Sequence, residues 1–232
     1  MTDLRCYYRA RLNPIEQQAY DLICEGLRLR RRELSLGRCT ELSRVLHAVN
    51  YDNPEFFFVN WLDHVRFWVR GDESVMRVSY LYDAAALGEM QQRIRTLARS
   101  IAGISDHGKA LGVHDFLVTH VDYDHGGLKQ LIRSPEMFSA AGPLLHGKGV
   151  CEGVSKLACC LLREKGVPCC VITGRAEDGT PHAWNATVAD GKTVYTDITY
   201  DMGLYCGGGA VPHRYFALTR EEMARDHLFE YI

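Results

Sequence analysis

The feature that most constrains the fold is the order of elements predicted within residues 151–197. Apolar side chains recur on one face of residues 151–165, which predicts an amphipathic helix, and Gly166 follows where a glycine suits the left-handed end of a helix. Three β-rich segments come next, at residues 168–174, 182–189 and 193–197. The Asp190-Gly191 pair between the last two is typical of a tight hairpin turn. The segment is thus predicted to be a helix followed by strands, the last two of which form an antiparallel pair.

A mixed helical and β extension is expected before this unit. Apolar spacing and capping residues predict helices over residues 14–27, 41–49 and 83–101. Runs rich in β-forming residues predict short strands over residues 56–59, 65–69 and 75–80. Ser105 or Asp106 is expected to cap a further helix, and residues 122–145 are predicted to be an irregular loop. We therefore divide the chain into an N-terminal extension, residues 1–104, and a core, residues 105–232.

The composition is that of a globular protein with no electrostatic preference for nucleic acid. Of the 232 residues, 47% are hydrophobic and 24% are charged, which allows a sizeable core, and the formal net charge is -2. The basic run within residues 28–32 lies at the end of a predicted helix, where positive side chains suit the helix dipole. No apolar stretch has the length of a bilayer span. We expect neither a nucleic acid nor a membrane as a partner.

The cysteines are expected to be free thiols. There are nine, an odd number, and the adjacent pairs at 159–160 and 169–170 do not resemble a disulfide framework. The N-terminus also lacks the apolar stretch of a secretory signal, so a cytoplasmic location is expected. Adjacent cysteines lack the two-residue gaps of zinc knuckles. The histidines at 107, 114, 120 and 125 have no carboxylate or thiolate at ligand spacing, so we expect no metal and no other cofactor.

One cysteine lies where a thiol nucleophile is most readily activated. Cys151 begins the predicted helix, and the positive end of a helix dipole lowers the pKa of a thiol. The free N–H groups of the first helical turn can also stabilise an oxyanion. Gly153, in the same turn, is expected to leave room for the backbone of a substrate.

His182 and Asp197 provide the other two groups of a thiol site. His182 begins one predicted strand and Asp197 ends the next, so a short hairpin places both at the same end of an antiparallel pair. Strands about 4.8 Å apart allow an imidazole and a carboxylate to bond. The carboxylate fixes the tautomer of the imidazole, whose other nitrogen can take the thiol proton. Each residue alone is more often structural, and it is their joint order that indicates catalysis.

Three motifs carry a family resemblance: Gly-Val-Cys-Glu-Gly at 149–153, His-Ala-Trp-Asn at 182–185 and Asp-Ile-Thr-Tyr-Asp at 197–201. In this order they resemble the transglutaminase-like superfamily, which has a papain-like α+β fold, over about residues 145–203. The resemblance implies that Cys151 is the nucleophile, His182 the general base and acid, and Asp197 the orienting residue. Looser matches to the bacterial branch flank the motifs, at residues 53–55 and 226–227.

Neighbouring residues are expected to support the site. Trp184, next to the histidine, either shields or lines the site or is a plain core aromatic. Asn185 and Asp201 are expected to hold the ends of the two strands together rather than to react. Tyr123 and His146 are interpreted as a loop tyrosine and an exposed histidine rather than as residues of the cleft.

The expected reaction is acyl transfer from a peptide or protein amide through a thioester on Cys151. Water as the acceptor makes the enzyme a peptidase or amidase, which we favour, and an amine as the acceptor makes it a protein cross-linking transglutaminase. The alternatives are a non-catalytic module that binds a peptide or a cell-wall fragment, and a structural partner protein. The sequence leaves the oligomeric state open.

Overall fold

A computed structural model describes residues 3–39, 41–62, 65–126 and 134–230. The helices are α1 (Pro14–Arg28), α2 (Leu42–Asp52), α3 (Ala84–Ser100), α4 (Asp106–His120), α5 (Ala141–His146), α6 (Cys151–Glu164), α7 (Ile198–Leu204) and α8 (Arg220–Met223). The strands are β1 (Glu33–Ser35), β2 (Arg66–Arg70), β3 (Glu73–Arg77), β4 (Asp122–Tyr123), β5 (Lys148–Gly149), β6 (Cys169–Ala176), β7 (Pro181–Ala189), β8 (Lys192–Thr196) and β9 (His227–Phe229). Short 3-10 helices are η1 (Leu4–Cys6), η2 (Arg9–Arg11), η3 (Pro54–Phe56) and η4 (Pro135–Phe138).

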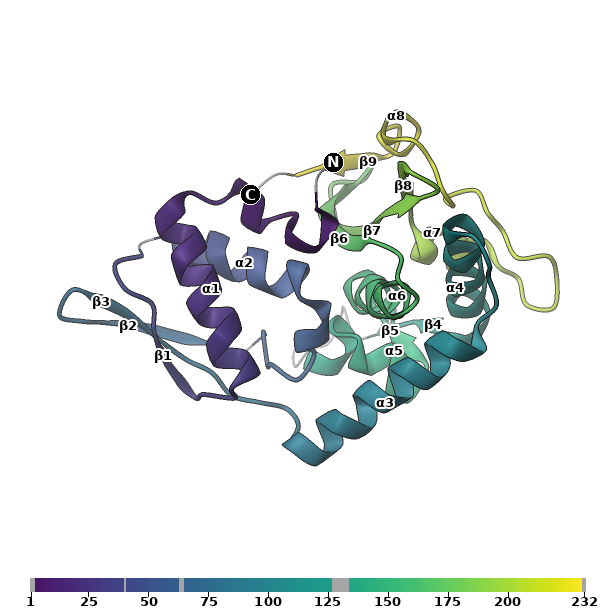
Figure 1. Ribbon diagram of the computed structural model, residues 1–232. Helices are drawn as coiled ribbons and strands as arrows, with labels where there is room; N and C mark the ends of the chain where they lie inside the picture. Colours follow the sequence, from purple (N-terminus) through teal and green to yellow (C-terminus); the bar gives the residue numbers. More distant parts are fainter. Residues whose placement is uncertain (1–2, 40, 63–64, 127–133, 231–232) are drawn as a thin grey trace.

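The helix α6 lies at the centre of the fold and is seen end-on in Figure 1. β6 and β7 cover one side of it, α4 lies on another side, and α3 and α5 pack below it in this view. Val154, Leu157 and Leu161 of α6 are at most 1% exposed. Because close-packed neighbours surround the helix on several sides, its N-terminal end is held in one place.

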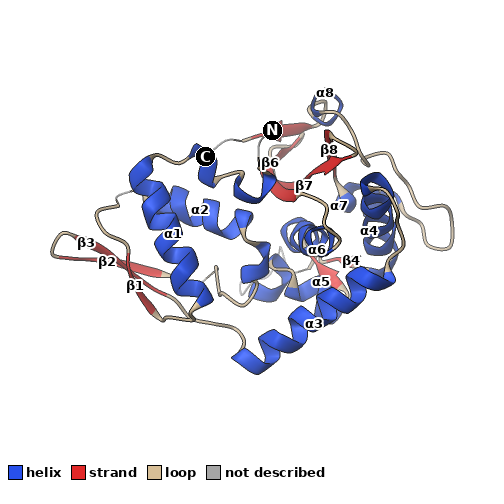
Figure 2. Cartoon of the chain, viewed as in Figure 1, coloured by secondary structure: helices blue, strands red, loops and turns tan. Residues whose placement is uncertain are grey.

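The strands next to α6 form an antiparallel sheet of order β8-β7-β6-β9. β7 and β8 are joined by the predicted hairpin, in which Asp190 and Gly191 both have positive φ angles, 48° and 81°. β9 approaches β6 so closely that a side chain at Gly174 would lie 2.1 Å from the Leu228 carbonyl oxygen. One helix bearing Cys151 against an antiparallel sheet confirms the predicted α+β fold (Figure 2).

The N-terminal part has an apolar core of its own, between α1, α2 and a small sheet of order β1-β3-β2. α1 begins as predicted, since Asn13 caps it and exchanges hydrogen bonds with Glu16 in a capping box. Leu34 of β1 packs so closely on this helix that Gly26 has no space for a side chain. The division of the chain at residues 104 and 105 stays a prediction.

Capping residues locate the later helices as well. The side chain of Asp83 accepts a hydrogen bond at the start of α3, and that of Ser105 does so at the start of α4. α3 occupies the predicted range, and α4 begins at the predicted cap, Ser105. No helix within the described ranges is both long and apolar enough to cross a membrane.

Two predictions of local structure are wrong. Residues 56–59 form no strand: Phe56 ends η3, Phe57 and Phe58 lie in a turn, and Val59 makes a single bridge to Tyr80. All three phenylalanines are buried in the core, which a half-exposed strand would not allow. Residues 122–145 are not simply a loop, since β4, η4 and α5 lie within them, and the part at 127–133 lies outside the described residues. β4 exists only through its pairing with β5, which is distant in sequence.

We expect Leu161→Ala to lower the free energy of unfolding by about 2–5 kcal/mol, because it leaves a cavity beside the central helix. Urea denaturation followed by circular dichroism measures the change. Ile104→Ala is the control: Ile104 is 99% exposed, so its loss should change stability by no more than about 0.5 kcal/mol. Equal losses in the two variants would contradict the central packing of α6.

Candidate functional site

Cys151 is the first residue of α6 and is 9% exposed. Val150 precedes it as the N-cap residue, and no side chain caps the first turn. The start of the helix therefore offers backbone N–H groups and the positive end of the helix dipole beside the thiol. This is the placement that the sequence predicts.

Gly153 serves the packing of the chain itself. A side chain there would lie 2.4 Å from the Met137 carbonyl oxygen and 3.0 Å from that of Ser139. The N–H of Val150 also donates to the Met137 carbonyl at 3.1 Å. The space that we expected for a substrate backbone is thus occupied by η4, which the glycine allows to pack against the first turn of α6.

His182 and Asp197 lie at the same end of the β7–β8 hairpin, and their side chains meet. His182 Nε2 lies 2.5 Å from Asp197 Oδ2. The other carboxylate oxygen accepts hydrogen bonds from the Thr199 hydroxyl at 2.8 Å and the Tyr200 N–H at 3.1 Å, because Asp197 is the N-cap of α7. The helix cap fixes the direction of the carboxylate, and the imidazole binds the oxygen that remains.

The pKa values of this pair move in opposite directions. Burial lowers the pKa of His182, but the adjacent Asp197 carboxylate and a contact with Cys151 outweigh burial and raise that pKa to about 10. Burial raises the pKa of Asp197, but His182 and His227 outweigh it and hold that pKa well below its usual range. His182 and Cys151 line the same cavity, and their interaction contributes to the raised pKa of His182. Thiol, imidazole and carboxylate therefore form one chain of contacts.

His227 is a fourth member of this cluster, and sequence reasoning did not find it. Its Nε2 lies 2.9 Å from Asp197 Oδ2, the oxygen that His182 also contacts, and its Nδ1 lies 2.6 Å from Asp226 Oδ1. The residue is 1% exposed and lies on the short strand β9. The only sequence signal was the loose family match at residues 226–227, which assigns no role.

Tyr123 lies against the cysteine rather than on an outer loop. Tyr123 and Cys151 line the same cavity, and the Tyr123 hydroxyl interacts with both the side chain and the backbone N–H of Cys151. Burial, followed by the interaction with Cys151, raises the pKa of Tyr123 well above its usual value, so the hydroxyl keeps its proton. The parallel pairing of Tyr123 with Gly149 brings it there. The interpretation of Tyr123 as a plain loop residue is wrong.

Trp184 is fully buried in the apolar cluster on the sheet. Its ring centroid lies 6.0 Å from that of His182 and 4.9 Å from that of His227. Of the alternatives for Trp184, packing in the core and shielding of the two imidazoles both apply.

Asn185 and Asp201 anchor different parts of the structure. Asn185 Nδ2 donates to the Ser155 carbonyl at 2.9 Å, which ties β7 to α6. Asp201 is fully buried on α7, where it contacts His114 Nε2 at 3.0 Å and accepts hydrogen bonds from the Tyr215 N–H at 3.1 and 3.2 Å. Asp201 thus holds α4 and the segment at Tyr215, rather than the ends of β7 and β8.

Two cavities border both His182 and Tyr123. One, of about 850 Å³, is also lined by Cys151. The other, of about 670 Å³, extends along α7 past Tyr200. Both volumes are within the range typical of ligand-binding sites. His146 lines neither of them and lies 2.8 Å from a glutamate oxygen at the surface, in agreement with its interpretation as an exposed residue.

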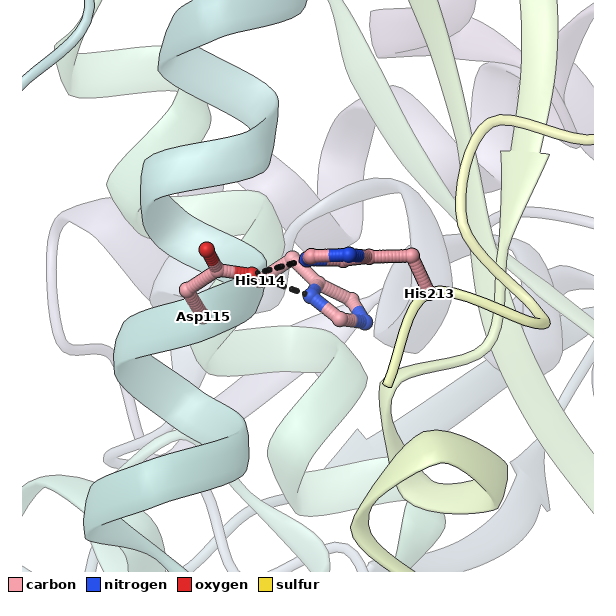
Figure 3. A group of neighbouring side chains, drawn as sticks. All are labelled: His114, Asp115 and His213. Atoms are coloured by element: carbon pink, nitrogen blue, oxygen red, sulfur yellow. Dashed lines mark hydrogen bonds and ion pairs between the residues drawn. The ribbon is translucent and has the colours of Figure 1, made fainter. Parts of the chain in front are cut away.

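Two groups of side chains in the described part of the chain have the composition of a metal site. They are His182, Asp197 and His227, and separately His114, Asp115 and His213 (Figure 3). The first group belongs to the cluster around Cys151. The second overturns the expectation that His114 lacks a carboxylate neighbour, because the fold brings it Asp201 and a loop histidine that spacing did not relate to it.

Residues 95–198 match the core model of the transglutaminase-like superfamily. Over this segment the chain is similar to that superfamily. The segment contains Cys151, His182 and Asp197 and ends at the start of α7. No curated protein sequence matches the chain.

Solved structures with a similar backbone are distant in sequence. One described as a TGase is 15% identical, with a TM-score of 0.47, over 66% of this chain and 47% of its own. A candidate cysteine protease from Cytophaga hutchinsonii is 16% identical, with a TM-score of 0.38, over 58% of this chain and 61% of its own. A candidate protease from Parabacteroides distasonis is 12% identical, with a TM-score of 0.37, over 56% of this chain and 35% of its own. This chain spans less than two thirds of each.

We expect the free energy of unfolding to fall more steeply with rising pH in the wild type than in His182→Gln. The pKa of His182 rises from 6.5 to about 10 on folding, so its stabilising contribution is complete below pH 6.5 and is lost as the pH rises through about 10. Urea denaturation at several pH values in this window measures the difference. Parallel curves for the two proteins would show that His182 is not held as a cation.

A second measurement tests whether Asp197 causes the raised pKa of His182. In Asp197→Asn the burial of His182 remains while the carboxylate is removed, so the imidazole pKa should fall well below about 10. NMR titration of the imidazole signals reports it, and the exposed histidines serve as the internal control. An unchanged His182 curve would remove Asp197 as the source of the shift.

Proposed function

We propose that this chain is a cysteine-dependent acyl-transfer enzyme that acts on peptide or protein amides, with hydrolysis as its main outcome. The observation that carries the proposal is the continuous chain of contacts from the Cys151 thiol through His182 to the Asp197 carboxylate. It lies at the start of a firmly packed helix and beside two cavities. The transglutaminase-like match of residues 95–198 supports the same chemistry.

The first half of the reaction uses the proton that His182 holds. The proton of the Cys151 thiol passes to His182, whose raised pKa favours the imidazolium form. The thiolate forms a C–S bond to the amide carbonyl carbon, and the carbonyl oxygen takes the negative charge. His182 then gives its proton to the nitrogen as the C–N bond breaks, and the amine leaves behind a thioester. Asp197 keeps the imidazole oriented throughout.

The oxyanion requires hydrogen-bond donors, and two lie next to the Cys151 thiol. The Cys151 N–H lies at the start of α6, and the Tyr123 hydroxyl contacts both this N–H and the thiol. Because its pKa is raised, the hydroxyl stays protonated and can donate to the oxyanion once a substrate carbonyl takes its place at the N–H. We therefore assign Tyr123 as the second oxyanion donor.

The second half of the reaction decides the product. Hydrolysis requires only that His182 take a proton from water as the water attacks the thioester, which frees the acid and restores the thiol. Transfer to a lysine-like amine would need a further binding site for that amine. Hydrolysis is the simpler outcome, and cross-linking is the alternative that product analysis identifies.

Thiol alkylation tests the activated pair without knowledge of the substrate. At pH 6 we expect iodoacetamide to label Cys151 at least about ten-fold faster than Cys206, although Cys151 is 9% exposed and Cys206 lies at the surface. Peptide mapping by mass spectrometry gives the two rates in one sample. His182→Ala should abolish the difference. Faster labelling of Cys206 in the wild type would favour a non-catalytic peptide-binding module.

Turnover of a peptide library tests the role of Tyr123. For the best amide found, Tyr123→Phe should lower kcat by about 10²–10³-fold, because one oxyanion donor is lost, and should leave fast alkylation of Cys151 in place. Tyr80→Phe is the matched control, since the Tyr80 hydroxyl bonds the Arg31 carbonyl in the N-terminal part. Mass analysis of the products distinguishes a free acid from an amine adduct. An unchanged kcat in Tyr123→Phe would remove it from the oxyanion site.

A further inference from the structure

A second cluster of ligand-type side chains lies on α4, outside the cluster around Cys151. His114 and Asp115 are consecutive residues of α4, and His213 reaches them from the loop that follows α7 (Figure 3). Asp115 Oδ1 lies 2.9 Å from His114 Nδ1 and 2.7 Å from His213 Nε2. Figure 3 shows both imidazoles turned toward this one carboxylate oxygen. The proposed reaction at Cys151 uses none of the three.

The hydrogen bonds of His114 indicate that Nδ1 is the ring nitrogen available to bind a cation. Asp201 Oδ2, on a fully buried carboxylate, can only accept, so His114 Nε2 donates its proton there, at 3.0 Å. In the neutral imidazole Nδ1 is then an acceptor. It faces Asp115 Oδ1, which is an acceptor as well, across 2.9 Å. Either a second ring proton or a bound cation can lie between these two atoms, and a metal ion would take the place of that proton.

A buried carboxylate behind a histidine is the usual support of a metal ligand. It fixes the tautomer, aims the free nitrogen and makes it more basic. Asp201 is itself held by the Tyr215 N–H at 3.1 and 3.2 Å, so the support is rigid. His114 is 1% exposed, whereas Asp115 and His213 are 37% and 42% exposed. The buried His114 is therefore fixed in position, whereas the side chains of Asp115 and His213 can adjust at the surface.

We propose that His114 Nδ1, Asp115 Oδ1 and His213 Nε2 bind a divalent transition-metal ion, with zinc as the best fit. Two imidazoles and one carboxylate suit zinc, cobalt or nickel, whereas calcium and magnesium prefer oxygen ligands. In a tetrahedral zinc site with bonds of about 2.0 Å the ligand atoms lie about 3.3 Å apart. The two nitrogen–oxygen distances to Asp115 Oδ1, 2.9 and 2.7 Å, would each lengthen by about half an ångström to match this value. Water completes the coordination on the open side.

The bound ion would join α4 to the segment before Tyr215. The Tyr215 carbonyl accepts the Asp197 N–H at 2.9 Å, and the Tyr215 N–H bonds Asp201. Asp197 and His114 are thus separated by a short series of backbone and carboxylate contacts. The role we assign to the ion is structural: it holds the loop that carries His213 against the helix next to α7.

Cobalt titration of the chelator-treated full chain tests the site. We expect the wild type to bind one Co²⁺ with visible d–d absorption and without the near-ultraviolet band of a cobalt–thiolate bond. His213→Asn and Asp115→Asn should each weaken binding at least ten-fold. His107→Asn is the matched control, because His107 lies on the same helix and contacts Phe216, as His114 does, but does not belong to the ligand group. Its affinity should equal that of the wild type.

Three results would overturn the proposal. They are no Co²⁺ binding by the wild type up to millimolar concentration, unchanged affinity in both His213→Asn and Asp115→Asn, and a thiolate band that places the ion on cysteine. Circular dichroism confirms that the variants are folded, which their exposed side chains favour. None of these readouts depends on turnover, so the metal site and the proposed reaction at Cys151 succeed or fail separately.

Discussion

The buried carboxylate of Asp197 is the interaction on which the rest of the site depends. One of its oxygens caps α7, through the Thr199 hydroxyl and the Tyr200 N–H, and the other meets the imidazoles of His182 and His227. A buried charge is stable only when its hydrogen-bonding capacity is met. Groups from β7, α7 and β9 meet it here, so the same contacts that stabilise the anion bring three elements into register.

The central helix α6 provides the other fixed point. Its apolar faces are enclosed by the sheet and by three helices, and its first turn is closed by η4 against Gly153. The parallel pairing of β4 with β5 then brings Tyr123 to the thiol of Cys151. Cys151 is thus held by the packing of α6, whereas the side chains next to it come from strands and short segments placed around the helix end.

Two histidine–aspartate pairs lie on either side of one backbone segment. Asp197 and Asp201 both belong to the α7 region, and Tyr215 bonds the first with its carbonyl and the second with its N–H. His182 contacts the Asp197 carboxylate, and His114 contacts the Asp201 carboxylate. The physical difference between the pairs is what faces the free imidazole nitrogen: a thiol in one case, and a carboxylate with a second histidine in the other. The first arrangement favours proton transfer, and the second favours a metal ion.

Local chemistry in the sequence determined helices α1, α2, α3, α4 and α6, the β7–β8 hairpin and the proximity of His182 to Asp197, because caps, glycine turns and apolar spacing act within a few residues. Only the tertiary structure decided what lies further apart in the chain. β9 brings His227 to Asp197, β5 brings Tyr123 to Cys151, and a loop brings His213 to His114. Strands of two or three residues have too little local preference to be predicted. They form only when pairing with a partner strand offsets the conformational entropy that they lose. The tertiary structure also decided residues 56–59: their composition favours a strand, but they are buried without forming one.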